Sequence, residues 1–253
     1  MRTTIGQRAA RILVATGIAA WATSSAGAAE IIVNGGFESG FSGWSRIDAL
    51  GSDGTFALQT GVASPVNGDP VPAPPQGTQA AMSDAQGPGS HALYQDFVVP
   101  ADAGAAQLSF ALFVGNRADI TGFSVPSPPT LDFAIAALNQ QARVDLLRGG
   151  ADPFSVAAGD VVANLFQTLP GDPLVSGYTT YSRDVGALLA GLVGETLRLR
   201  FSQTDNAAVF QFGVDAVSLS TGAVVGKVAA PQTTLLLAIG LAALWAARRR
   251  SGR

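Results

Sequence analysis

The chain has 253 residues, of which 47% are hydrophobic and only 13% are charged, with 30 glycines, 14 prolines and no cysteine. The lack of cysteine excludes disulfide bonds, thiolate catalysis and zinc–thiolate sites. All 18 acidic residues lie between Glu30 and Asp215, whereas seven of the 15 basic residues lie near the two ends, which leaves a net charge of about −10 between them. This charge disfavours nucleic acid and anionic membranes as partners, and it is compatible with divalent cations.

The first 29 residues have the composition of a secretory signal peptide. Arg2, Arg8 and Arg11 precede an apolar run over 12–22, and small residues follow over 24–29. A basic segment, a short apolar segment and a small-residue cleavage region are the three parts of such a signal. We therefore expect a signal helix within 1–29, removed by signal peptidase during export.

Residues 30–221 are expected to form one domain of short strands separated by turns. Two proline-rich segments, 60–77 and 121–130, are predicted to be loops because proline cannot join a strand ladder. Segment 131–138 should pair with 142–147 as a hairpin, and 161–168 is ambiguous between a strand and a short helix. One or two helical turns are expected over 185–193. The remaining strands are predicted over 31–33, 44–48, 55–58, 79–83, 91–99, 105–114, 178–184, 196–202 and 209–219.

The strand over 196–202 shows the clearest alternation. Leu197, Leu199 and Phe201 should face a core, and Arg198 and Arg200 the opposite side. Antiparallel strands with this pattern indicate an all-β fold, an antiparallel β-sandwich of the jelly-roll type. A β-helix is the structural alternative, but no fixed repeat period is present.

The C-terminal end has the layout of a membrane segment. A linker over 222–230 precedes Pro231, an apolar run over 235–247, and the cluster Arg248, Arg249 and Arg250. An apolar stretch closed by arginines predicts a transmembrane helix with a cytoplasmic stop. The 20 residues from 228 to 247 are near the minimum length for crossing a bilayer.

This tail, 231–253, resembles the PEP-CTERM sorting signal of Gram-negative bacteria, although Ala230-Pro231-Gln232 stands where Pro-Glu-Pro is expected. The resemblance implies processing by an exosortase-like enzyme and an association with exopolysaccharide production. The protein would be held at the inner membrane and then released to the cell envelope or the extracellular space. A plain C-terminal membrane anchor is the alternative.

The domain itself resembles galactose-binding-like jelly rolls, a group that includes carbohydrate-binding modules. The opening motif is Asn34-Gly35-Gly36-Phe37-Glu38 followed by Gly43-Trp44. The closing motif runs from Thr196-Leu197-Arg198-Leu199-Arg200-Phe201 through Thr204-Asp205-Asn206 to Phe212-Gly213-Val214-Asp215-Ala216-Val217-Ser218-Leu219. The two motifs frame residues 34–219 and specify the fold better than the function.

The jelly-roll resemblance implies a structural Ca²⁺ held by Glu38 and Asp215, which would fasten the first strand to the last. The family often has a second aspartate where this chain has Ala216. Asp53 and Asp205 are further oxygen donors on loops. In the alternative without metal, Glu38 accepts backbone N–H bonds in its turn and Asp215 faces solvent.

Other functional residues are sparse. Trp44, Tyr94, Tyr178 and Tyr181 are the aromatic candidates for stacking on sugar rings, with Trp44 more readily packed over the sandwich end. Arg198 and Arg200 could bind a carboxylate or uronic acid, or face solvent. The single histidine, His91, is interpreted as a polar strand residue, because no Gly-x-Ser-x-Gly elbow accompanies it.

Three functions follow from these features. The favoured hypothesis is an exported, non-catalytic protein of the cell envelope or extracellular matrix that contacts exopolysaccharide. The alternatives are an exported glycan hydrolase that uses carboxylates and a purely structural surface protein without a ligand.

Overall fold

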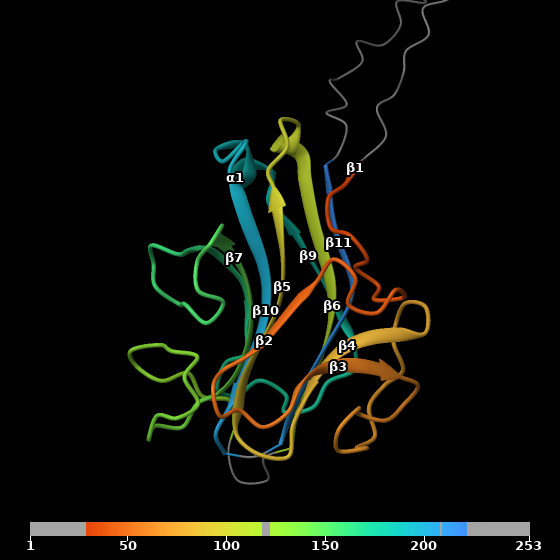
Figure 1. Cartoon of the computed structure of the whole chain (residues 1–253), viewed down its shortest axis with the longest axis vertical. Helices are drawn as coiled ribbons and strands as arrows, with labels where there is room; N and C mark the ends of the chain where they lie inside the picture. Colours follow the sequence, from red (N-terminus) through yellow and green to blue (C-terminus); the bar gives the residue numbers. More distant parts are fainter. Residues whose placement is uncertain (1–28, 118–121, 208, 222–253) are drawn as a thin grey trace, which may run out of the picture.

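The computed structural model describes residues 29–117, 122–207 and 209–221 (Figure 1). The predicted linker and sorting signal lie outside these residues, as does the predicted signal peptide except for Ala29, which belongs to β1. No helix in the described ranges is long and apolar enough to cross a membrane. The elements are β1 (Ala29–Glu30), β2 (Ser45–Asp48), β3 (Thr55–Thr60), β4 (Gln79–Asp84), β5 (Gly89–Val98), a 3-10 turn (Ala103–Ala105), β6 (Ala106–Asn116), β7 (Gln140–Arg148), β8 (Val161–Gln167), β9 (Thr179–Asp184), α1 (Gly186–Ala190), β10 (Thr196–Asp205) and β11 (Phe210–Thr221).

The strands form two antiparallel sheets that pack face to face, which confirms the predicted β-sandwich (Figure 1). One sheet has the order β3-β4-β11-β6-β9, with β1 paired to β11, and the other has the order β2-β5-β10-β7-β8. Both central strands, β10 and β11, come from the end of the chain, so they pair with segments far away in sequence. The closing motif therefore supplies the central strand of each sheet.

The core lies between the sheets and contains a row of aromatic rings. Ring centroids are 6.0 Å apart for Trp44 and Phe201, 5.6 Å for Phe201 and Phe110, and 5.8 Å for Phe110 and Tyr181. Leu197, Leu199 and Phe201 are buried on the inner face of β10, as their alternation predicts. Trp44 is only 7% exposed, so the expectation that it packs against the sandwich is confirmed.

Three local predictions are wrong or shifted. Residues 31–33 are not a strand, although Ile31 N still donates to Leu219 O at 2.8 Å. Residues 131–138 form a loop rather than one arm of a hairpin, because their side chains alternate poorly and Asn139 and Asn206 hold the backbone in turns. The ambiguous segment 161–168 contains the edge strand β8.

The outer face of the β5-β10-β7 sheet differs most from expectation. Arg198 and Arg200 point to the side predicted, but Arg198 is 8% exposed and Arg200 is fully buried. Arg198 donates to Ala151 O, and Arg200 donates to Pro153 O and Ser155 O, each at 2.6–2.7 Å. The two arginines thus fasten the loop over 149–159 onto the sheet, and the prediction of solvent-facing or ligand-binding side chains is wrong for this reason.

Candidate functional site

A cleft of about 390 Å³ opens where the two sheets end, between the edge strands β8 and β9. We call it the edge cleft. Its volume lies in the range of small-ligand sites, roughly 300–1,000 Å³. The lining residues that matter for its chemistry are Phe166, Gln167, Asp172, Ser176, Thr179 and Tyr181.

The apolar wall of the edge cleft is aromatic. Tyr181 on β9 and Phe166 on β8 meet edge to face with ring centroids 5.0 Å apart, and both side chains are partly exposed. Tyr181 also stacks on Phe110 in the core, at 5.8 Å and an interplanar angle of 26°. Because the sandwich core fixes one side of this pair, the rings are held rigidly at the cleft.

The polar groups of the edge cleft come from the loop between β8 and β9. Asp172 Oδ2 accepts the backbone N–H of Leu169 at 2.8 Å, which holds the turn. Ser176 Oγ accepts Val114 N–H at 3.1 Å, so its own hydroxyl hydrogen can still be donated. Burial, followed by the charge of Asp172, raises the pKa of the Tyr181 hydroxyl, whereas Arg183 lowers it. The cleft thus combines ring faces with hydroxyl and carboxylate groups, which is the chemistry that binds sugar rings.

The predicted metal ligands Glu38 and Asp215 both hydrogen-bond to the same short segment, 76–79. Glu38 accepts the backbone N–H groups of Thr78 and Gln79 at 2.8 Å each, and Asp215 Oδ2 accepts that of Gln76 at 3.0 Å. We call these two carboxylates the acid pair.

Close backbone packing brings the acid pair together. A Cβ atom on Gly35 would lie 1.7 Å from Val217 O, so only glycine allows the opening turn to touch the last strand there. Val217 N donates to Gly35 O at 2.9 Å, next to a bulge in β11 where Ala216 has φ +50°. The sequence motifs therefore encode a real contact between the two ends of the domain.

Neither carboxylate of the acid pair forms an ion pair with a cationic side chain among the described residues. Asp215 is fully buried, and burial together with the Glu38 charge raises its pKa to about 6 despite two backbone N–H bonds. Backbone bonds from Thr78 and Gln79 lower the pKa of Glu38. The alternative in which Asp215 faces solvent is wrong, and Glu38 accepts N–H groups from a distant loop rather than from its own turn.

The donor set of the acid pair fits a hard cation. Within the described ranges no cluster of three His, Cys, Asp or Glu side chains could hold a metal. Further ligands would therefore be carbonyl and water oxygens, which calcium accepts readily. Asp53 and Asp205 do not join the pair: Asp53 accepts Gln86 N–H, and Asp205 accepts the Gln203 amide. The calcium site stays a prediction.

His91 is buried rather than surface-exposed. Its Nδ1 lies 2.7 Å from Asp48 Oδ1, and its Nε2 has no hydrogen-bond partner among the residues that the structure describes. The same inner face of the sheet carries Gln203 and Asp205, and burial raises the pKa of Asp205 to about 7. His91 has the same strand parity as Leu93 and Phe97, which was a usable sequence signal for its inward direction.

The remaining aromatic candidates do not form a shared platform. Trp44 Nε1 donates to Asn34 O at 3.1 Å inside the core, and the ring of Tyr94 lies under the Arg198 guanidinium, 3.9 Å from its carbon. The Tyr178 hydroxyl donates to Gln59 Oε1 at 2.8 Å, and burial raises its pKa. Only Tyr181 reaches a cleft. Sequence reasoning missed Phe166 and Asp172, which contribute to the site only because β8 and β9 end side by side.

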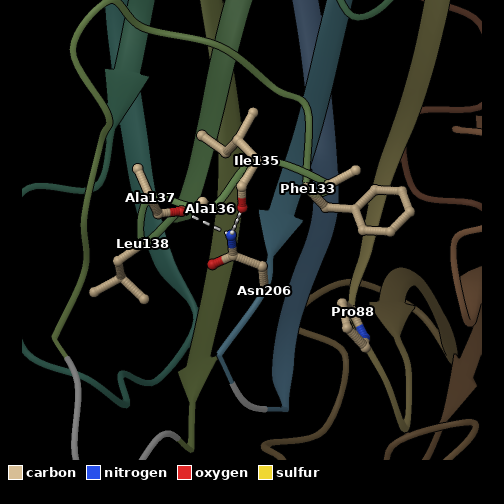
Figure 2. Close-up of a pocket in the computed structure, with 8 residues that line it drawn as sticks. Pro88, Phe133, Ile135, Ala136, Ala137, Leu138 and Asn206 are labelled. Carbon is tan, nitrogen blue, oxygen red and sulfur yellow. Dashed lines mark hydrogen bonds between the residues drawn. The ribbon is translucent and has the colours of Figure 1, made fainter.

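A second hollow, of about 460 Å³, lies where the loop over 133–138 crosses the end of β10 (Figure 2). The Asn206 amide donates to Ile135 O at 3.2 Å and Ala137 O at 2.8 Å (Figure 2). Its carbonyl accepts Asn139 N–H at 2.8 Å. Its side-chain polar groups therefore hold the loop. Asn206 is the single polar side chain in the described lining of this hollow, so the hollow offers a ligand fewer free side-chain polar groups than the edge cleft does.

Comparison with solved structures returns β-sandwich proteins at low similarity. A carbohydrate-binding module in complex with β-1,4-galactotriose has 14% identity and a TM-score of 0.43, with 76% of this chain and 97% of that chain covered. An apo cyclase from Fischerella sp. has 16% identity, a TM-score of 0.44 and coverage of 78% and 97%. The K1 cleaved adhesin domain of Lys-gingipain from Porphyromonas gingivalis W83 has 15% identity, a TM-score of 0.39 and coverage of 73% and 94%.

No protein-family model matches the chain, and no curated protein matches its sequence. Structural similarity at these identities and TM-scores assigns neither a family nor an activity to the chain.

Proposed function

We propose that this protein is an exported, non-catalytic glycan-contacting protein of the cell envelope or extracellular matrix. The observation that carries the proposal is the edge cleft, where the partly exposed rings of Tyr181 and Phe166 face the hydroxyl and carboxylate groups of the 168–178 connection. A sugar ring would pack its C–H face on the aromatic pair and exchange hydrogen bonds with Asp172, Ser176 and Thr179.

The route proposed for the protein is export by the signal peptide, cleavage by signal peptidase and sorting of the tail by an exosortase-like enzyme. The residues assigned to this tail are Pro231, Arg248, Arg249 and Arg250. Mass analysis of the mature C-terminus tests the route: removal of the arginine cluster supports sorting, and a terminus that still ends at Arg253 supports a plain anchor.

A calcium ion at the acid pair is proposed as a structural cofactor. It would bind Glu38 and Asp215, supply the positive charge that the pair lacks, and fasten the opening turn to β11. The ion would have no part in glycan chemistry, because it belongs to the outer side of the β11 sheet and the cleft lies at the sandwich edge.

A non-catalytic role is supported by the surroundings of the most reactive groups. His91 is fully buried, and the other polar side chains nearby, Gln203 and Asp205, already bond to each other. The buried Asp145 carboxylate accepts hydrogen bonds from two arginines, Arg143 and Arg200. In the part of the chain that is described, the edge cleft contributes a single carboxylate, whereas glycoside hydrolysis uses two on opposite sides of the bond.

The test is retention of the full chain on immobilised neutral polysaccharides, in a detergent without a sugar headgroup. Tyr181→Ala removes the ring face and should abolish retention, and Tyr94→Ala is the control because that ring lies under Arg198, away from the edge cleft. Tyr181→Ala should also lower the thermal unfolding midpoint of the ligand-free protein, because the ring stacks on Phe110, so retention of every variant is measured well below its midpoint. Equal retention of both variants would overturn the proposal.

A further inference from the structure

We infer that the edge cleft selects neutral glycans over carboxylated ones, and that Asp172 is the residue that sets this selectivity. The inference rests on the proposed function and adds the chemical class of the ligand. It follows from the charges around the cleft rather than from its shape.

Asp172 is the charged residue of the cleft lining and is exposed to a ligand. Its Oδ2 is held at 2.8 Å by Leu169 N–H, so the carboxylate has a fixed position. It lies close enough to Tyr181 for its charge to raise the pKa of the tyrosine hydroxyl. A ligand that stacks on Tyr181 must therefore approach this carboxylate.

A fixed carboxylate discriminates between ligands by charge. It accepts hydrogen bonds from sugar hydroxyls, and bonds to an ionised acceptor are stronger than neutral ones. The carboxylate of a uronic acid placed in the same cleft would be repelled instead. A neighbouring like charge of this kind is expected to weaken binding by about tenfold.

The described lining of the edge cleft contains no lysine, arginine or histidine, so Asp172 has no cationic partner within the lining. Arg183 lies over the Tyr181 ring, with its guanidinium carbon 5.7 Å from the ring centre, and its charge opposes that of Asp172 at the tyrosine hydroxyl. Its Nε donates to Leu165 O at 3.2 Å and one terminal nitrogen donates to Ser182 O at 3.0 Å. Arg183 thus links β9 to β8, and its hydrogen bonds are directed at carbonyls rather than at the cleft.

In the alternative, Asp172 has a structural role only and accepts the Leu169 N–H that holds its turn. Asp172→Asn separates the two roles, because the amide oxygen can still accept Leu169 N–H while the charge is lost. Asp132→Asn is the matched control: Asp132 is also exposed, also accepts a backbone N–H, from Ala134 at 2.8 Å, and lies outside the edge cleft. Both variants change the net charge by the same amount.

The experiment measures binding of the full chain to dextran and hydroxyethyl cellulose and to their carboxymethyl derivatives, at low and high salt. We expect about tenfold weaker binding to the carboxymethyl polymers, a difference that Asp172→Asn reduces to about twofold or less. Asp132→Asn should leave the difference unchanged, because it makes the same change in net charge at a position outside the edge cleft.

The outcomes separate the two proposals. Tyr181-dependent binding with no preference between neutral and carboxymethyl polymers, or a preference that Asp172→Asn leaves intact, overturns the inference and leaves the proposed function standing. Stronger binding to the carboxymethyl polymers that is lost in Arg183→Gln also overturns it. Absence of Tyr181-dependent binding to every polymer overturns the proposed function and this inference together.

Discussion

Two buried aspartates, one on each sheet, differ in how the negative charge of the carboxylate is stabilised. Asp145 on β7 accepts two bonds from Arg143, at 2.7 and 2.8 Å, and another from Arg200. Burial alone would raise its pKa, but the two arginines outweigh this effect and hold the pKa below the ordinary value. Asp215 on β11 has only backbone N–H partners, and its pKa is raised to about 6.

The two aspartates also differ in the source of the positive charge that balances them. Asp145 carries its own cations, which also fasten the 149–159 loop through Arg200, so it needs nothing from outside the chain. Asp215 and Glu38 hold two negative charges at one place without a cationic side chain among the described residues. Such an arrangement is stable at neutral pH when it binds either a proton or a cation.

Removal of the Asp145 charge should have the largest effect on stability. Asp145→Asn leaves Arg143 and Arg200 buried beside each other without their shared anion, at a cost of about 3–5 kcal/mol in the free energy of unfolding. Urea denaturation monitored by the fluorescence of Trp44 measures the loss. Asp132→Asn, a change of equal charge on an exposed loop, should shift the free energy by no more than about 0.5 kcal/mol. Equal effects of the two substitutions would contradict the role of the arginines.

Calcium should have the next largest effect, through the acid pair. An excess of free Ca²⁺ about 100-fold above its dissociation constant should stabilise the folded state by about 3 kcal/mol and raise the unfolding midpoint by roughly 5–10 °C. EDTA should reverse the shift, and Mg²⁺ should not replace Ca²⁺ because the site supplies a flexible set of oxygens.

Asp215→Asn should remove the calcium shift, whereas Glu38→Gln should only reduce it, because the glutamate is solvent-exposed and its amide can still accept Thr78 N–H. A midpoint that is the same in calcium and in EDTA for the native chain would remove Glu38 and Asp215 as metal ligands.

The third effect is a pH dependence of the calcium-free protein. Between the ordinary pKa of 3.8 and about 6, folded Asp215 retains a proton that the unfolded chain has lost. The contribution of Asp215 to stability therefore falls as the pH rises through this interval, by about 3 kcal/mol at most, and levels off above it. Asp205, with its pKa raised to about 7, continues the fall to neutral pH.

Asp145 has the opposite effect on the pH dependence of stability. Because its pKa is lowered in the folded state, its stabilising contribution is lost only as the pH falls below about 4. Urea denaturation at several pH values in EDTA measures the profile. Asp215→Asn should flatten the part between pH 4 and 6 while the part near pH 7 remains. An unchanged profile in this variant would show that Asp215 ionises normally.

The sequence was sufficient for the fold class but not for the site. Alternation over 196–202 identified an inner face of β10 correctly, because burial of Leu197 and Phe201 is a property of a single strand. It could not show that a loop 45 residues earlier covers the other face, so the sequence predicts for Arg198 and Arg200 either solvent exposure or binding of a carboxylate. Whether a loop covers a sheet depends on tertiary contacts, and the alternation of side chains along one strand does not report them.

The same limit applies to the edge cleft. Tyr181 could be proposed because tyrosine is a common sugar contact, but Phe166 lay in a segment of ambiguous structure and Asp172 in a turn. Strands β8 and β9 belong to different sheets, and the site exists because both are edges. The acid pair was easier to predict, because its residues lie in the motifs that open and close the domain.

The pairing of β1 with the end of β11 has a mechanical consequence. Ala29 lies opposite Thr221, so both ends of the folded body leave from one pole of the sandwich (Figure 1). A pull through either end is then borne by the same corner, where Glu30 accepts hydrogen bonds from Ser218 and Leu219. A body tethered through Thr221 would therefore have this corner next to its attachment.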